Sequence, residues 1–185
     1  EGIIVGSGIG KVNAAMMTEH LIDKYDVDVV ISSGCAGSLT DKLNVLDVVV
    51  PDYVTYHDFL PERVMRYSVP DEGNIKVDES LVNLFKQVIS SMENVNCVST
   101  PICSGDCYVT DDSTAKDIVT RTGATVVDME SAAIAHVCRK NNIPFITIRT
   151  ISDFANGNDD FEKQASYHSS EIIYKCVEKL LTKGL

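Results

Sequence analysis

Positive charge is scarce in this sequence. Its 185 residues include 16 Lys and Arg against 27 Asp and Glu, which gives a formal net charge of −11 without any cluster of basic residues. Such a surface repels phosphate backbones, so nucleic acid is excluded as an expected partner. No apolar run approaches the ~20 residues that a membrane helix needs, and the first residues do not resemble a signal peptide. We therefore predict no nucleic-acid or membrane partner and a small neutral or cationic ligand.

The six cysteines lack the spacing of a metal site or a redox pair. They form no CxxC pair and occur at positions 35, 97, 103, 107, 138 and 176. Cys103 and Cys107 are spaced CxxxC, and no histidine motif of zinc spacing accompanies them. Several lie in apolar contexts, where free cysteine behaves as a small core residue. The pattern predicts no metal and no cofactor, and a reducing, cytoplasmic compartment.

The apolar pattern predicts a single α/β domain over residues 1–185. Apolar residues make up 44% and charged residues 23% of the chain, and there are no repeats or linkers. Strand patterns occupy residues 3–5, 27–31, 45–51 and 95–103. Helical patterns occupy residues 12–24, 81–91, 113–121 and 161–182. Residues 53–73 are expected to be irregular, and we regard this region as a candidate interface.

A glycine-rich turn, GSGIGK at residues 6–11, suggests a phosphate loop at first sight. A Walker loop would need Gly at position 5 and Ser or Thr at position 12, where Val5 and Val12 stand. The dinucleotide fingerprint also fails, because the glycines run GxGxG. What remains is a glycine turn that leads into a helix, and both close backbone packing and ligand contact explain it.

Three other positions carry candidate chemistry. His57 and Asp58 could form a catalytic pair, but adjacent residues on an extended chain point in opposite directions, so we prefer a structural histidine. Asp106 follows a strand pattern and is expected to cap a turn. Tyr108 stands where it could stack on a planar ligand, with a core position as the alternative.

The most informative stretch is residues 125–153. Val126 and Val127 end a buried strand, residues 130–142 have helical spacing, and a second apolar run follows at residues 145–148. Strand, helix and strand at this length predict a βαβ unit with parallel strands. Asp128, Glu130 and Asp153 would then lie beyond the carboxyl ends of two strands, where ligand crevices of α/β sheets open.

Five short motifs together resemble a known family. They are SGIGKV at residues 7–12, SGCAG at 33–37, SGD at 104–106, VDMESAA at 127–133 and ISD at 151–153. In this order they closely resemble the nucleoside phosphorylase/nucleosidase superfamily, most of all its 5′-methylthioadenosine/S-adenosylhomocysteine nucleosidases. The resemblance implies a three-layer α/β/α fold with a central, largely parallel twisted sheet. It also implies a homodimer that hydrolyses the N-glycosidic bond of a purine nucleoside to adenine and the thioribose.

The resemblance implies a role for each matched acidic residue. Asp153 corresponds to the acid that protonates the purine N7, and Ser152 orients it. Met129 and Glu130 hold the ribose hydroxyls, and Asp128 supports them. Cleavage builds negative charge on the departing purine and positive charge on the ribose, so a proton donor at the base and an ionised carboxylate at the sugar suit the reaction.

The resemblance also implies contacts to the base and the sugar. Tyr108 corresponds to an aromatic residue that stacks on adenine, and the backbone of Val109 would read the adenine edge. Cys35, Ala36 and Gly37 form the small-residue loop beside the sugar. Cys35 departs from the family, whose nucleosidases more often carry Ser at this position.

The nucleophile leaves two alternatives open. Phosphorylases of the superfamily place an Arg just before the small-residue loop, whereas residues 31–33 here are Ile-Ser-Ser. Water is therefore preferred to phosphate, and a phosphorylase is the alternative. The family's general base, a glutamate, lies N-terminal to the matched stretch and has no counterpart in this sequence. We expect the N-terminal strands of the family sheet to be missing too, and a nucleoside-binding fold without turnover is the second alternative.

Overall fold

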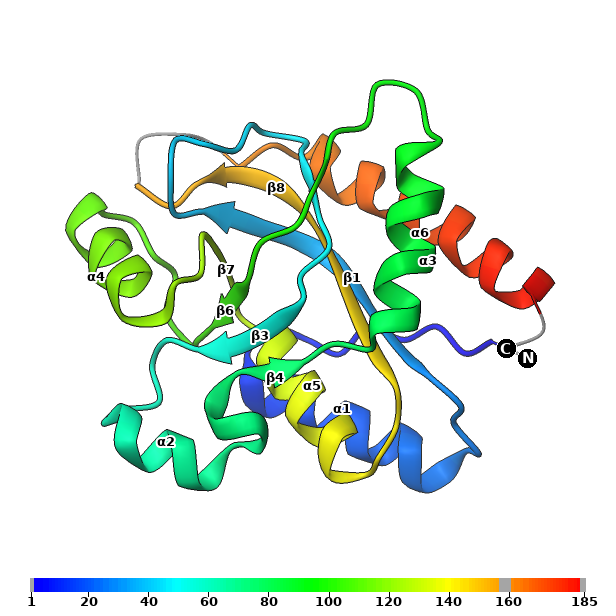
Figure 1. Ribbon diagram of the computed structural model, residues 1–185, viewed down its shortest axis with the longest axis horizontal. Coiled ribbons are helices and arrows are strands. Elements are labelled where there is room, and N and C mark those ends of the chain that lie inside the picture. Colours follow the sequence, from blue (N-terminus) through cyan, green and yellow to red (C-terminus); the bar gives the residue numbers. More distant parts are fainter. Residues whose placement is uncertain (1, 157–160, 184–185) are drawn as a thin grey trace.

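The computed structural model describes residues 2–156 and 161–183. Its strands form one sheet in the order β4-β3-β6-β7-β1-β8-β2-β5, with helices on both sides (Figure 1). The strands are β1 (Val30–Ser38), β2 (Val48–Val49), β3 (Tyr53–Tyr56), β4 (Ile75–Lys76), β5 (Cys97–Val98), β6 (Ile102–Ser104), β7 (Val126–Asp128) and β8 (Phe145–Phe154). The predicted α/β class is confirmed.

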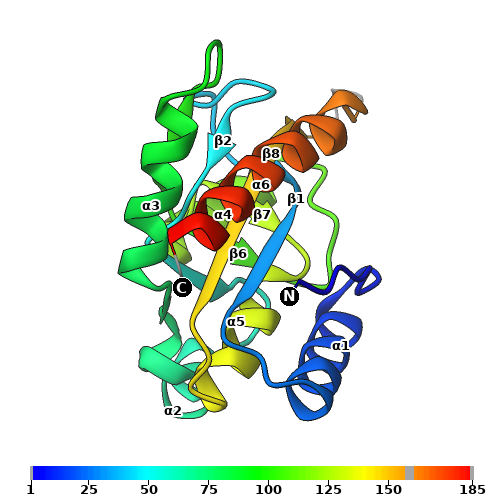
Figure 2. The same ribbon diagram turned by 90° about the vertical axis from the view of Figure 1, so that its right-hand side faces the viewer.

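The helices pack on the sheet in two groups. They are α1 (Lys11–Lys24), α2 (Glu62–Ser68), the 3-10 helix η1 (Pro70–Gly73), α3 (Glu79–Ser90), α4 (Asp112–Thr122), α5 (Ser131–Lys140) and α6 (Gln164–Lys183). Figure 2 shows α6 lying across β1 and β8 with α3 beside it. On β1, the Ser33 hydroxyl is hydrogen-bonded to Ser169 of α6, whereas the hydroxyl of its neighbour Ser32 accepts a hydrogen bond from Arg149. Because successive side chains of a strand point to opposite faces, α5, which contacts the Arg149 side, covers the other face.

The long strands β1 and β8 form the centre of the sheet. They pair in parallel from Val30 opposite Phe145 to Ser38 opposite Phe154, with a register shift between Ala36 and Gly37. The pairs β2–β5, β3–β6 and β6–β7 are also parallel, whereas β1–β7, β2–β8 and β3–β4 are antiparallel. The sheet is therefore mixed, with its longest pairing parallel.

The prediction of a parallel βαβ unit over residues 125–153 is wrong. β1 lies between β7 and β8 and runs parallel to β8 but antiparallel to β7. The spacing of strand, helix and strand does not determine which distant strand is inserted between the two. Asp128 and Asp153 still lie near the same end of β1, because Gly37 on β1 is paired with Val127 on one side and Asp153 on the other.

Several element boundaries also differ from the predictions. Residues 53–73 are not irregular but contain β3, α2 and η1, and the pattern at 95–103 divides into β5 and β6. The small-residue segment at 33–37 is not a loop, because β1 continues through it to Ser38. Ile3, Ile4 and Val5 form no strand and are 51%, 100% and 46% exposed, because they have no strand partner among the described residues.

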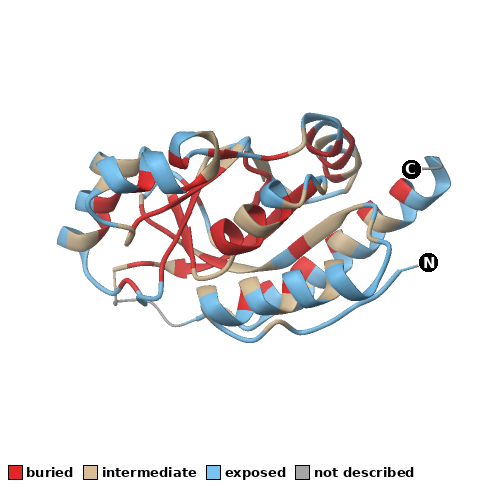
Figure 3. Cartoon of the chain, turned by 90° about the horizontal axis from the view of Figure 1, so that it is seen from below, coloured by how far each residue is buried: buried red, intermediate tan, exposed pale blue. Residues whose placement is uncertain are grey.

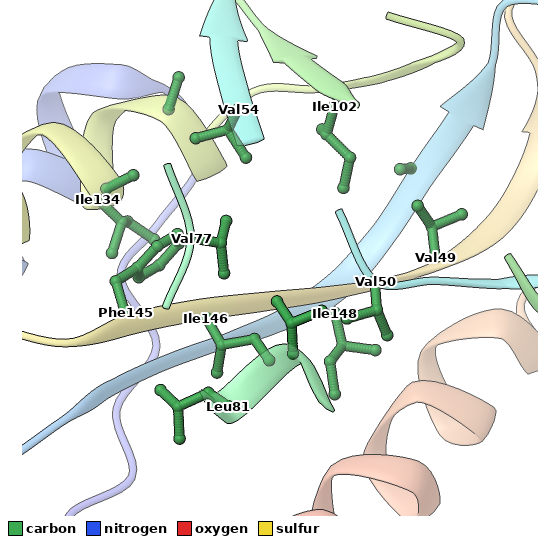
Figure 4. Close-up of a cluster of buried hydrophobic side chains, with 14 of the residues drawn as sticks. Val49, Val50, Val54, Val77, Leu81, Ile102, Ile134, Phe145, Ile146 and Ile148 are labelled. Carbon is green, nitrogen blue, oxygen red and sulfur yellow. The ribbon is translucent and has the colours of Figure 1, made fainter. Parts of the chain in front are cut away.

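Core packing explains which helix faces are buried, and capping residues explain where the helices begin and end. In α6, which runs towards the C-terminal label in Figure 3, buried residues recur every three or four positions, as an amphipathic helix requires. The Asp78 side chain caps α3 by accepting from the Leu81 N–H, and Gly123 closes α4 in the left-handed conformation. Figure 4 shows aliphatic side chains of β2, β3, β6, α3, α5 and β8 meeting in one cluster. Within the described ranges, no helix is long and apolar enough to cross a membrane.

Candidate active site

Glu130 lies where β7 passes into α5. It occupies the N-cap position of α5, but its side chain makes no capping hydrogen bond. Instead, Oε1 accepts a hydrogen bond of 2.9 Å from the backbone N–H of Gly10, in the glycine turn before α1. Burial raises the pKa of Glu130, and the Gly10 N–H opposes that shift by stabilising the carboxylate. The carboxylate is therefore half-buried and held at one oxygen, and it is not used as a helix cap.

Asp128 is held in a buried ion pair with Arg149. Asp128 Oδ2 lies 2.8 Å from Arg149 Nε, and the two side chains are only 1% and 3% exposed. The Asp128 carboxylate also accepts hydrogen bonds from the Ser104 hydroxyl at 2.5 Å and from both the hydroxyl and the backbone N–H of Ser131. Arg149 Nη1 in turn donates to Ser32 Oγ at 3.0 Å. Both carboxylate oxygens of Asp128 therefore accept hydrogen bonds, as expected of a supporting residue.

Asp153 lies near the end of β8 and is buried. Its Oδ2 accepts a 2.7 Å hydrogen bond from Ser152 Oγ, which also donates to Ala36 O at 3.2 Å. Gly37 stands opposite Asp153, and a Cβ on Gly37 would lie only 3.2 Å from Asp153 Oδ1. The lack of a side chain at position 37 therefore leaves this carboxyl oxygen accessible from β1.

The segment between β6 and α4 carries Tyr108 and Val109. Val109 is buried, whereas Tyr108 is 63% exposed and so is not a core aromatic residue. Slight burial raises the pKa of the Tyr108 phenol, and the Asp153 carboxylate raises it further. Tyr108 is therefore within electrostatic reach of Asp153, on the open side of the sheet end.

Two cavities adjoin these groups. The smaller, of about 230 Å³, is lined by the glycine turn, β1, β8 and the start of α5, through Ser7, Gly8, Ile9, Ser32, Ser33, Gly34, Cys35, Glu130, Ile134 and Arg149. The larger, of about 480 Å³, lies against α4 and includes Ser38 and Phe154. The Gly37–Asp153 pair stands between these linings along β1 and β8. Cys35 and Glu130 thus share one cavity, and Asp153 lies next to it and not in it.

The sequence analysis assigned no role to Arg149. Residues 31–33 contain no cation, as the sequence shows, but the Arg149 guanidinium reaches Ser32 from the neighbouring strand. One signal was present in the sequence: Arg149 is the only charged residue in the apolar stretch 145–152. A cation in a buried strand requires an anionic partner, which Asp128 provides.

His57 and Asp58 do not form a catalytic pair. Asp58 binds Lys11, whose Nζ lies 2.6 Å from each carboxylate oxygen. His57 is buried, and its Nε2 has no hydrogen-bond partner in the part of the chain that the structure describes. Asp106 does not cap its own turn but accepts from the Lys11 backbone N–H at 2.7 Å. The preference for a structural histidine agrees with this burial.

Comparisons with known proteins show similarity over nearly the whole chain. The family model of the phosphorylase superfamily matches residues 2–182. A 5′-methylthioadenosine/S-adenosylhomocysteine nucleosidase of Bacillus cereus is 38% identical over 190 residues, covering 97% of this chain and 82% of that protein. The structure of the Neisseria meningitidis nucleosidase in complex with methylthio-immucillin-A gives a TM-score of 0.84 at 32% identity, over 93% of this chain and 78% of that chain. Futalosine hydrolase of Helicobacter pylori gives 0.84 at 29% identity, over 94% and 77%.

Proposed function

The chain belongs to the phosphorylase superfamily, and we propose that it hydrolyses the N-glycosidic bond of 5′-methylthioadenosine or S-adenosylhomocysteine, releasing adenine and the thioribose. One observation carries the proposal. A buried Asp153, hydrogen-bonded to Ser152, and a half-buried Glu130 approach the same segment of β1 from two sides of the sheet end. A nucleoside laid along β1 would meet one carboxyl group at its base and the other at its ribose.

At the base, Asp153 donates the proton that the departing purine needs at N7. Ser152 fixes the rotamer of this carboxyl group by hydrogen-bonding one oxygen, which leaves Oδ1 on the side of Gly37. The exposed ring of Tyr108 stacks on the purine, and the Val109 backbone reads its edge. Protonation of a leaving group by a positioned acid contributes on the order of 10²- to 10⁴-fold to the rate.

At the sugar, Glu130 and Met129 hold the ribose hydroxyls beside Cys35, Ala36 and Gly37. Gly10 occupies Oε1 of Glu130, so Oε2 is the oxygen that accepts from the ribose. Its negative charge stabilises the positive charge that develops on the ribose during cleavage. Asp128 supports this arrangement by accepting from the Glu130 backbone N–H at 3.3 Å.

The charges around the smaller cavity favour water over phosphate as the nucleophile. Arg149 supplies one positive charge there, but Asp128 pairs with it and Glu130 adds a second negative charge. The three groups sum to about −1, so a phosphate dianion is repelled, whereas a neutral water is not. The charge balance therefore favours water even though the Arg149 guanidinium lies beside Ser32.

We also propose that two copies of this chain form a dimer and that the protein works in the reducing cytoplasm. Exposed apolar side chains gather around α2, where Leu60, Val64 and Tyr67 are 60%, 43% and 93% exposed. A surface of this kind suits an interface. Sedimentation analysis of the wild type and of a Val64→Glu, Tyr67→Glu variant checks this; a monomeric wild type contradicts it.

The function is tested by following adenine release. Wild-type protein is incubated with 5′-methylthioadenosine, with and without phosphate, and adenine is expected in both cases. Release only with phosphate establishes the phosphorylase alternative, and tight binding without release establishes the nucleoside-binding alternative. Because a futalosine hydrolase has a similar fold, S-adenosylhomocysteine and futalosine are tested in parallel to identify the preferred 5′-substituent.

The proton donor is tested by Asp153→Asn. The variant should lose about 10²- to 10⁴-fold in turnover while its circular dichroism and melting temperature stay close to wild type. Asp117→Asn, which changes an exposed carboxylate on α4, serves as the matched control. Near-normal turnover in Asp153→Asn would mean that another group protonates the purine.

A further inference from the structure

The glycine turn before α1 holds Glu130 through Gly10, and its backbone amides contact two different segments of the chain. Gly10 N–H donates to Glu130 Oε1 at 2.9 Å, and Lys11 N–H donates to Asp106 Oδ1 at 2.7 Å. The first N–H groups of a helix have no partner within the helix, so they are free to orient side chains from elsewhere. Gly10 has a φ of 92°, a conformation that favours glycine.

The Lys11 side chain extends these contacts into a closed network of polar interactions. Its Nζ lies 2.6 Å from Asp58, which follows β3, and 3.8 Å from Asp106 Oδ2. Asp58 Oδ2 in turn accepts a 2.8 Å hydrogen bond from the Asp106 N–H. Lys11, Asp58 and Asp106, which we call the lysine clasp, thus connect the glycine turn, the β3–α2 segment and the β6–α4 segment.

We propose that the lysine clasp positions Glu130 for ribose binding. A glutamate side chain has several rotatable bonds, and a hydrogen bond to one carboxylate oxygen determines where the second oxygen points. The Gly10 N–H makes that hydrogen bond, and the clasp fixes the turn from which it is made. Lys11 and Asp58 touch no reacting atom and act through Gly10, so they are positioning residues. This inference rests on the proposed ribose-binding role of Glu130.

The partial burial of the Lys11–Asp58 ion pair supports its positioning role. The side chains of Lys11 and Asp58 are 24% and 26% exposed, so the pair is screened less than a surface ion pair. By comparison, Lys86 and Asp52 form an ion pair at 3.1 Å with exposures of 31% and 69% and contact none of the site residues. The two lysines therefore provide a matched comparison of a positioning ion pair and a peripheral one.

The test measures discrimination between ribose hydroxyls. Binding of 5′-methylthioadenosine and of its 2′,3′-dideoxy analogue to the full chain is measured by calorimetry for wild type, Lys11→Met and Lys86→Met, each carrying Asp153→Asn so that the nucleoside is not hydrolysed during the titration. Wild type should prefer the hydroxylated nucleoside by about tenfold or more, as expected for hydrogen bonds to a charged group. Lys11→Met should lose most of this preference while its affinity for the analogue changes less than about twofold. Lys86→Met should keep the wild-type preference.

Other outcomes overturn the inference in separable ways. Equal weakening of both ligands in Lys11→Met, or no weakening of either, shows that the clasp does not act through the ribose hydroxyls. Failure of the wild type to bind the nucleoside, or to discriminate between the two ligands, refutes the proposed site itself. Asp58→Asn removes the other half of the clasp and gives the same readout where Lys11→Met folds poorly; if Asp58→Asn keeps full discrimination, the clasp has no positioning role.

Discussion

Replacing Arg149 with Met tests the buried ion pair at the centre of the site. The substitution removes the 2.8 Å contact with Asp128 and the 3.0 Å hydrogen bond to Ser32, and it leaves a carboxylate that is only 1% exposed without its cation. Breaking a buried pair from one side costs about 3–5 kcal/mol. Two serine hydroxyls continue to donate to the carboxylate, so the lower end, about 3 kcal/mol, is expected.

Urea unfolding at neutral pH measures this cost. At about 3 kcal/mol, a chain of 185 residues should also melt roughly 6–12 °C lower. Lys86→Met is the control, because its exposed ion pair with Asp52 should contribute no more than about 1 kcal/mol. An unchanged m-value indicates that the midpoint reports stability and not a change in compactness.

A second substitution separates the pair from its surroundings. Asp128→Asn removes the charge that Arg149→Met leaves unpaired, so the double variant should be less destabilised than the sum of the two single variants by about 1 kcal/mol or more. Additive costs, or a loss in Arg149→Met no larger than in the Lys86→Met control, would refute the reasoning that the buried charges depend on each other.

Two further predictions concern the ends of the site. Gly37→Ala brings a Cβ to 3.2 Å from Asp153 Oδ1, so nucleoside turnover should fall by about tenfold or more for a destabilisation of about 1–3 kcal/mol; wild-type kinetics would show that this oxygen is not used. Burial lowers the pKa of His57 from its ordinary 6.5; Asp58 and Asp128 oppose this shift, and Arg121 and Lys11 add to it. The His57 imidazole therefore binds a proton more readily in the unfolded chain than in the folded chain. The urea midpoint should fall as the pH decreases from about 6.5 to about 5. His57→Gln should flatten that decrease, the exposed His20→Gln should not, and equal slopes in all three proteins would contradict the prediction.

Local patterns predicted most helices well because their signals are local. The apolar face at residues 81–91 and the cap residue Asp78 lie within α3 or next to it, so the helix that the structure shows at Glu79–Ser90 needs no distant information. The same holds for α1 and α4. Strand neighbours are different. Nothing within residues 125–153 indicates that β1 is inserted between β7 and β8, so the direction of β7 was predicted wrongly.

Motifs in the sequence point to the candidate site residues, but they do not predict which residues these contact. Gly10 and Glu130 are 120 positions apart in the sequence, far beyond the range over which a local pattern can predict a contact. The Arg149–Ser32 hydrogen bond spans 117 positions and brings a cation to a segment that contains none itself. These contacts depend on the packing of β1 against β8 and of α1 against α5, which appears only once the sheet order is known.

The difference between Asp128 and Glu130 shows why spacing alone does not assign roles. On a continuing strand, two residues that are two positions apart point to the same face and would share one environment. The chain leaves β7 after Asp128, and Glu130 adopts a φ of −133° and a ψ of −39° at the start of α5, which turns its side chain away. Asp128 consequently meets a guanidinium and two hydroxyls, whereas the Glu130 carboxylate accepts from the Gly10 N–H at Oε1 and has a further backbone contribution from Met129. The donors that surround Asp128 agree with the supporting role proposed for it, and the sparser donors around Glu130 agree with the ribose-binding role proposed for that residue.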